Sequence, residues 1–148
     1  MFTKIVVGLD GSAPSENALR AACDLAKKYQ AELHLVHTPQ PKTVAFALGA
    51  VTGYHTVTTM PSDEEVETAA NTVIESALAI AEELHQPIAQ THTQRGRPAD
   101  EIVSYANSNG ADLIVTGRRG LGNVSALIQG STTQDVSHLA QCACLSVA

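Results

Sequence analysis

The sequence is poor in the residues with which several classes of protein bind their ligands. Aromatic residues make up only 3% of the chain and tryptophan is absent, so stacking platforms for single-stranded nucleic acid are not expected. Acidic residues outnumber basic ones, and the net charge of −6 argues against a broad electrostatic contact with nucleic acid or with an anionic membrane. No apolar run approaches the roughly 18 consecutive residues of a membrane span.

Cysteine is also scarce. The three cysteines are Cys23, Cys142 and Cys144; their number is odd and the last two are too close for an ordinary disulfide, which favours a reducing cytoplasm. The amino terminus passes directly from Met1 into a predicted strand and leaves no room for a secretory signal. With 148 residues and 44% hydrophobic content, the chain is expected to form a single cytoplasmic domain over residues 1–148.

Short apolar runs alternate with helical periodicities along the chain. Runs that are β-branched or alternate apolar and polar residues predict strands, and apolar residues at helical spacing predict the helices between them. The expected strands cover residues 4–9, 31–37, 88–93, 112–116 and 143–147, and the expected helices cover residues 15–29, 62–84, 98–109 and 131–140. This β–α alternation predicts an α/β sandwich around a mostly parallel sheet.

Two connecting regions have distinctive sequences. Ser62 followed three residues later by Glu65 forms a capping box, which predicts where the longest helix begins. Residues 38–61 are interrupted by prolines and glycines, so no regular element is expected there. A loop of that length inside one domain is typical of a lid or a dimer contact, with a plain surface excursion as the alternative.

A glycine-rich stretch, residues 116–132, connects the fourth expected strand to the last expected helix. Glycine allows the backbone to approach a ligand closely, and amides at the start of a helix attract phosphate. A flexible surface loop is the alternative interpretation. The spacing is G-x2-G-x9-G-S, formed by Gly117, Gly120, Gly130 and Ser131, and it matches neither the Walker A motif nor G-x-G-x-x-G.

Other candidate residues follow the first two expected strands. In an open parallel sheet, ligands bind outside the carboxyl ends of the strands, where the strand order reverses. Asp10 follows the first strand and could accept hydrogen bonds from ribose hydroxyls or help to hold a metal. Its alternative role is to cap the following helix or turn, and both interpretations stay open. Thr38 follows the second strand, where its backbone could contact the edge of an adenine base.

Together these features resemble the ATP-binding branch of the universal stress protein family. The resemblance rests on the glycine spacing, on the first strand with Asp10-Gly11-Ser12, and on residues 96–102, 111–117 and 130–147, so it covers the whole chain. It implies a Rossmann-like three-layer sandwich of the adenine nucleotide alpha hydrolase-like type. The sheet of that fold is parallel and five-stranded, with the order 3-2-1-4-5.

The resemblance also implies a set of binding residues. Asp10 matches the family's acid beside the ribose, Thr38 matches a position whose backbone faces adenine, and the glycines with the residues after them match the phosphate-binding positions. Arg118 and Arg119 vary in the family, but beside a triphosphate they could donate charge-assisted hydrogen bonds. The full candidate set is Leu9, Asp10, Thr38, Thr116, Gly117, Arg118, Arg119, Gly120, Gly130, Ser131 and Thr132.

The function implied by the resemblance is ATP binding, with or without Mg, in a cytoplasmic stress-response or signalling module. A homodimer is expected through the last strand, Ala143 to Val147, with an unidentified protein partner and no contact with nucleic acid or membrane. No catalytic base is evident, so we expect at most slow ATP hydrolysis. The alternatives are a metal-assisted nucleotide hydrolase or transferase that uses Asp10, and a nucleotide-free dimeric scaffold.

Overall fold

The computed structural model describes residues 1–41, 44, 60–118 and 131–148 of the chain. Its strands are β1 (Lys4–Leu9), β2 (Glu32–His37), β3 (Gln90–Thr93), β4 (Leu113–Gly117) and β5 (Ala143–Val147). Its helices are α1 (Ala13–Tyr29), α3 (Asp63–Glu83), α4 (Pro98–Ser108) and α5 (Ser131–Leu139). Strands and helices alternate in the order that the sequence predicts.

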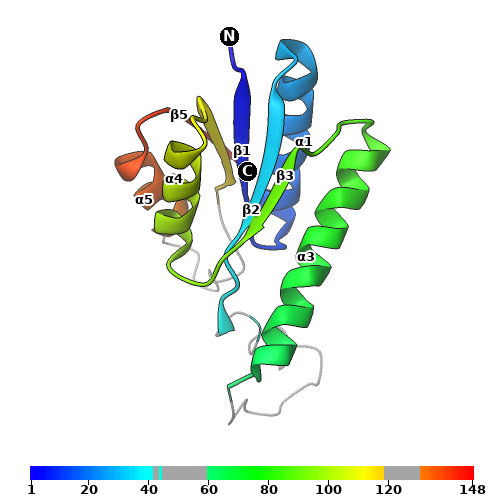
Figure 1. Ribbon diagram of the computed structural model, residues 1–148, viewed down its shortest axis with the longest axis vertical. Coiled ribbons are helices and arrows are strands. Elements are labelled where there is room, and N and C mark those ends of the chain that lie inside the picture. The colour runs from blue at the N-terminus through cyan, green and yellow to red at the C-terminus, as the bar shows by residue number, and fades with distance from the viewer. Residues whose placement is uncertain (42–43, 45–59, 119–130) are drawn as a thin grey trace.

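The strands form one parallel sheet in the order β3-β2-β1-β4-β5. Helices α1 and α3 lie on one face of this sheet, and α4 and α5 lie on the other (Figure 1). The three layers and the strand order confirm the predicted α/β sandwich.

Burial on both faces explains why the central strands are continuous apolar runs. In β1, Ile5 and Val7 pack into a cluster with α1 and α3, whereas Val6 between them packs into a second cluster with α4 and α5. Successive side chains of a strand point to opposite faces, so β1 contributes to both cores at once.

Serine side chains cap the starts of α1 and α3. Ser12 caps α1 by accepting a hydrogen bond from the amide of Ser15 at 3.3 Å. The capping box of α3 is confirmed, because the Ser62 amide donates to Glu65 Oε2 at 2.7 Å and the Glu65 amide donates to Ser62 Oγ at 3.2 Å. At the starts of α1 and α3, a capping side chain therefore replaces a missing intrahelical partner, whereas α4 begins without a side-chain cap.

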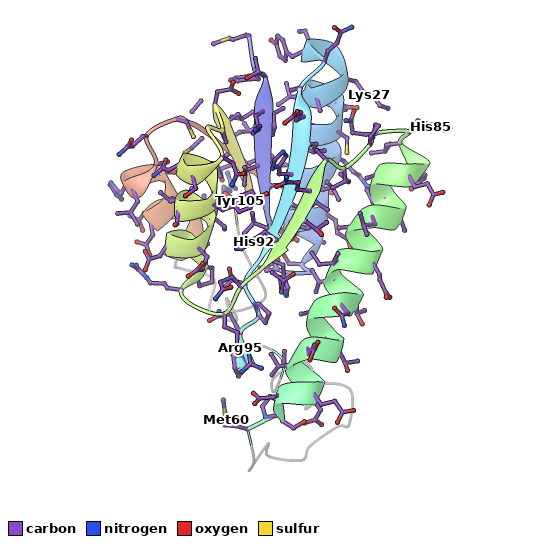
Figure 2. All side chains as sticks on the ribbon, viewed as in Figure 1. Lys27, Met60, His85, His92, Arg95 and Tyr105 are labelled. Carbon is purple, nitrogen blue, oxygen red and sulfur yellow. The ribbon has the colours of Figure 1, made fainter. Side chains whose placement is uncertain are left out.

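A polar network joins α4 to the strands beneath it. The Tyr105 hydroxyl donates to Gln90 Oε1 at 2.9 Å and lies 3.0 Å from His34 Nδ1. The ring of His92 stacks on Tyr105 with 4.8 Å between ring centroids (Figure 2). Burial lowers the pKa of His34, which favours the neutral ring. The network aligns α4 with β2 and β3.

Two sequence-based expectations differ from the structure. β3 begins at Gln90 instead of residue 88, and most of its residues are exposed because it is an edge strand that α4 covers only in part. The helical spacing of Val136 and Leu139 in the sequence predicts that both lie on the apolar face of the last helix, but Leu139 is 47% exposed, whereas Val136 is 1% exposed. Leu139 is the final residue of α5, beyond the turn that Val136 packs against the core.

None of the helices in the described part of the chain combines the length and the apolar character that a bilayer crossing requires.

Candidate functional site

The carboxyl ends of β2, β1 and β4 lie next to one another in the sheet. Leu9 is in register with His37, and Gly8 is in register with Thr116. The segments that follow these strands therefore begin at the same end of the sheet, toward the lower end of the strands in Figure 1. The fold thus brings Asp10, Thr38 and Gly117 to three adjacent strand ends, as the sequence predicts.

Asp10 takes part in the turn that starts α1. Its Oδ1 atom accepts hydrogen bonds from the Ser12 amide at 2.9 Å and from the Ser12 hydroxyl at 2.5 Å. Since Ser12 is the cap of α1, the carboxylate supports the capping side chain. This structural role was one of the two interpretations of Asp10, and the role in ligand binding stays a prediction.

The His37 side chain hydrogen-bonds the last residue of β1. Its Nδ1 atom lies 2.8 Å from the Leu9 carbonyl oxygen, and because a carbonyl only accepts, Nδ1 carries the hydrogen. Burial lowers the pKa of His37 despite this hydrogen bond and the nearby Asp10, so the neutral ring is favoured. The sequence analysis did not place His37 in the site, because its contact depends on the register of β1 against β2.

Thr38 is 6% exposed, and within the described part of the chain its hydroxyl has no hydrogen-bond partner. Its carbonyl oxygen accepts from Gln40 Nε2 at 3.4 Å. The same Nε2 lies 3.0 Å from the carbonyl oxygens of Pro39 and Gly96. Gln40 therefore ties the end of β2 to the turn before α4, a role that its position in a loop did not reveal.

Gly117 packs tightly against the first turn of α1. A Cβ atom added to it would lie 2.7 Å from the Pro14 carbonyl carbon and 2.7 Å from the Ser15 amide nitrogen. Both are backbone atoms, which cannot move aside as a side chain can. Glycine at this position is thus required by packing, and its predicted contact with phosphate is a separate role that the packing does not test.

Thr133 holds the start of α5 against the end of β4. Its hydroxyl donates to the Gly117 carbonyl oxygen at 2.7 Å and lies 3.4 Å from the Thr116 hydroxyl, which donates to it. The first turn of α5 is therefore fixed beside the end of β4. Thr133 was missed by the sequence analysis because a hydroxyl in the first turn of a helix gives no sign of its tertiary partner.

The remaining candidates are described in part. Arg118 is exposed, and its amide donates to the Val147 carbonyl oxygen at 2.6 Å, which links the end of β4 to β5. Ser131 and Thr132 are the first two residues of α5, and Leu9 is the last residue of β1. Arg119, Gly120 and Gly130 lie outside the described residues.

A metal site made only of protein ligands is not found among the described residues, because no three His, Cys, Asp or Glu side chains there are grouped to hold an ion.

The strand order and the two helix layers define a doubly wound parallel α/β protein. Its strand order reverses between β1 and β4, so the carboxyl ends of these strands flank the switch point. The model of the universal stress protein family matches residues 1–148, and the chain belongs to this family.

Individual relatives agree with this assignment. The chain is 37% identical to the universal stress protein YxiE of Bacillus subtilis over 99% of both chains. It superimposes on the universal stress protein UspA of Lactobacillus plantarum with a TM-score of 0.77 at 23% identity, covering 99% of this chain and 97% of that one. A universal stress protein from Archaeoglobus fulgidus, solved in complex with dAMP, gives a TM-score of 0.70 at 22% identity over 99% and 98% of the two chains.

Proposed function

We propose that this protein binds an adenine nucleotide at the carboxyl ends of β2, β1 and β4, with ATP as its ligand. The observation that carries the proposal is the position of the glycine pattern: its first glycine, Gly117, ends β4, and its last residues open α5, which Thr133 fixes to β4. The universal stress protein from Archaeoglobus fulgidus has been solved with dAMP bound, which supports an adenine nucleotide as the class of ligand.

Each part of the nucleotide has candidate partners in this arrangement. The base would lie near Thr38, the ribose near Asp10, and the phosphates between Gly117 and Gly120 on one side and Gly130, Ser131 and Thr132 on the other. Amides of the first turn of α5 suit the phosphates because the positive end of the helix dipole attracts anions. Arg118 and Arg119 add cationic groups beside them.

Binding rather than turnover is the proposed activity. The one buried imidazole at this edge in the described residues, His37, is engaged with the Leu9 carbonyl, and Asp10 Oδ1 holds Ser12. Hydrolysis of ATP is therefore expected to be slow at most, with or without Mg. We propose that the protein acts as a dimeric stress-response or signalling module in the cytoplasm, joined through β5, with an unidentified protein partner.

The test combines identification of the natural ligand with a pair of glycine variants. Small molecules released from the purified and denatured protein are expected to include an adenine nucleotide by mass spectrometry. Gly120→Val and Gly130→Val should each place a side chain where phosphate lies and abolish ATP binding by calorimetry, while circular dichroism stays unchanged.

A third glycine gives the matched control. Gly110 has a φ of +65° with nothing within 4 Å of an added Cβ. It precedes β4 and so lies near the amino-terminal ends of the strands, away from the proposed site. Gly110→Asn, which suits this backbone conformation, should bind ATP like the wild type. ATP affinity that is unchanged in both valine variants would refute the proposal.

A further inference from the structure

A partly enclosed pocket lies between α1 and α3, the two helices that cover one face of the sheet (Figure 1). Its volume is about 120 Å³. Its apolar wall is made of one side chain from β1, one from α1 and two from α3: Leu9, Leu19, Val73 and Ala77. An apolar cavity of roughly 150 Å³ can hold a benzene molecule, so this pocket has room for a body of about five non-hydrogen atoms.

The pocket is separate from the proposed nucleotide site. The Leu9 side chain packs into the core under α1 and α3, whereas α5, with the proposed phosphate-binding residues at its start, covers the opposite face of the sheet. The turn after β1 borders the pocket through Gly11, where an added Cβ would lie 3.0 Å from Val73 Cγ2. A ligand between α1 and α3 would therefore lie behind this turn, in another layer than the start of α5.

The hydrogen-bond donors at the start of α1 are already engaged. The Ser15 amide donates to Ser12 Oγ at 3.3 Å, and the Glu16 amide donates to the Ser12 carbonyl oxygen at 3.0 Å. The Ser15 hydroxyl, which lines the pocket, donates to the same carbonyl oxygen at 3.0 Å. The positive end of the α1 dipole already has the Glu16 carboxylate beside it. These groups therefore give an incoming anion little attraction.

Oxygen atoms that can accept hydrogen bonds remain on the pocket wall. Glu16 is half-buried, and among the described residues its carboxylate has no hydrogen bond or ion pair. The Ser76 hydroxyl likewise has no partner within the described ranges. The Thr72 hydroxyl donates to the Thr68 carbonyl oxygen at 3.0 Å, which leaves its lone pairs able to accept. The described residues that line the pocket include one carboxylate and no Lys, Arg or His, so they favour a cation.

We propose that this pocket binds a small primary alkylammonium ion. The alkyl chain packs against the apolar wall, where its removal from water is favourable. The ammonium group has three N–H donors and no acceptor, which suits a wall that offers acceptors. The nearby cation of α1 is engaged elsewhere, because Arg20 Nη1, one turn after Glu16, lies 3.7 Å from Glu83 Oε2. The Glu16 carboxylate therefore gives the site its preference for positive charge. The proposal does not depend on nucleotide binding.

The test compares three ligands with the same four-carbon chain: n-butylammonium, n-butanol and butyrate. Titrations of the 148-residue chain followed by amide NMR shifts should give n-butylammonium a Kd of about 1 to 10 mM. It should bind about two- to fivefold more tightly than n-butanol, the range expected for a partly exposed ion pair, and butyrate should bind most weakly. The largest shifts are expected at the amides of Gly11, Val73 and Ala77, which line the pocket.

Variants separate the carboxylate from the shape of the pocket. Glu16→Gln removes the charge and keeps the size of the side chain, so n-butylammonium should bind it no more tightly than n-butanol. Glu75→Gln is the matched control, because Glu75 is an exposed carboxylate of α3 outside the pocket lining, and it should keep the wild-type preference. Thr72→Leu enlarges a side chain of the wall and should weaken both ligands by about fivefold or more.

Three results would overturn the proposal. The first is that none of the three ligands gives saturable shifts at the amides around the pocket. The second is that the wild type binds n-butanol or butyrate at least as tightly as n-butylammonium. The third is that Glu75→Gln loses the preference to the same extent as Glu16→Gln, which would attribute it to the negative charge of the whole protein. All three results would leave the proposed nucleotide site standing.

Discussion

At the scale of single residues, two glycines at neighbouring strand ends have different reasons to be glycine. An added Cβ at Gly8 would lie 2.6 Å from Ile102 Cδ1, the end of a flexible side chain. At Gly117 it would lie 2.7 Å from backbone atoms of Pro14 and Ser15. Because side chains can change rotamer and the first turn of α1 cannot, the two positions should respond differently to a methyl group.

Gly117→Ala should therefore destabilise the protein by about 1–3 kcal/mol, the usual cost of overpacking. Gly8→Ala should cost less, because Ile102 can move aside. The free energies of unfolding, measured in urea, would compare the two. An equal loss of stability in both variants would contradict the packing role of Gly117.

At the scale of elements, the start of α5 is positioned by one side chain rather than by its apolar face alone. Thr133 Oγ1 donates to the Gly117 carbonyl oxygen at 2.7 Å. α5 is a short helix, from Ser131 to Leu139, with Val136 as its fully buried residue among those described. Short helices are marginal without tertiary contacts, so this hydrogen bond should matter for where the first turn lies.

Thr133→Val should remove about 1 kcal/mol of stability and, under the proposed function, should weaken ATP binding through a misplaced first turn. Ser137→Ala is the control within the same helix, because the exposed Ser137 hydroxyl donates to the Thr133 carbonyl oxygen of its own helix. Chemical denaturation and calorimetry would measure both effects. If the two variants bind ATP equally well, Thr133 does not position the site.

At the scale of the whole molecule, the two edges of the sheet differ in how they meet solvent. β3 is four residues long and consists of polar side chains, which discourages pairing with another sheet. β5 is five residues long and carries Ala143, Leu145 and Val147, and most of it is exposed. An exposed apolar edge strand is normally covered, which supports the proposed dimer through β5.

Leu145→Arg should convert a dimer into a monomer, because it places a charge on the proposed pairing strand. Leu78→Arg on α3 is the control: Leu78 is 39% exposed and Leu145 is 37% exposed, so both substitutions alter a similarly accessible leucine. Size-exclusion chromatography with light scattering would give the masses. A dimer that persists in Leu145→Arg would place the interface elsewhere, and a wild-type monomer would refute the dimer.

The sequence by itself determined the order of the elements, their approximate bounds and the family. These features are local: apolar runs give β1 and β2, the capping box starts α3, and the glycine spacing identifies the connection from β4 to α5. Each depends on residues close together in the chain, so periodicity and capping chemistry reveal it.

Only the tertiary structure decided which groups meet at the carboxyl ends of β2, β1 and β4. The contact of His37 with the Leu9 carbonyl, the Gln40 tie to Gly96 and the Thr133 bond to Gly117 join residues from different elements. Likewise, the tight packing of Gly117 on Pro14 and the lack of a partner for the Thr38 hydroxyl depend on how strands and helices stack. Such contacts are set by register and by layer packing, and no pattern within a single element encodes them.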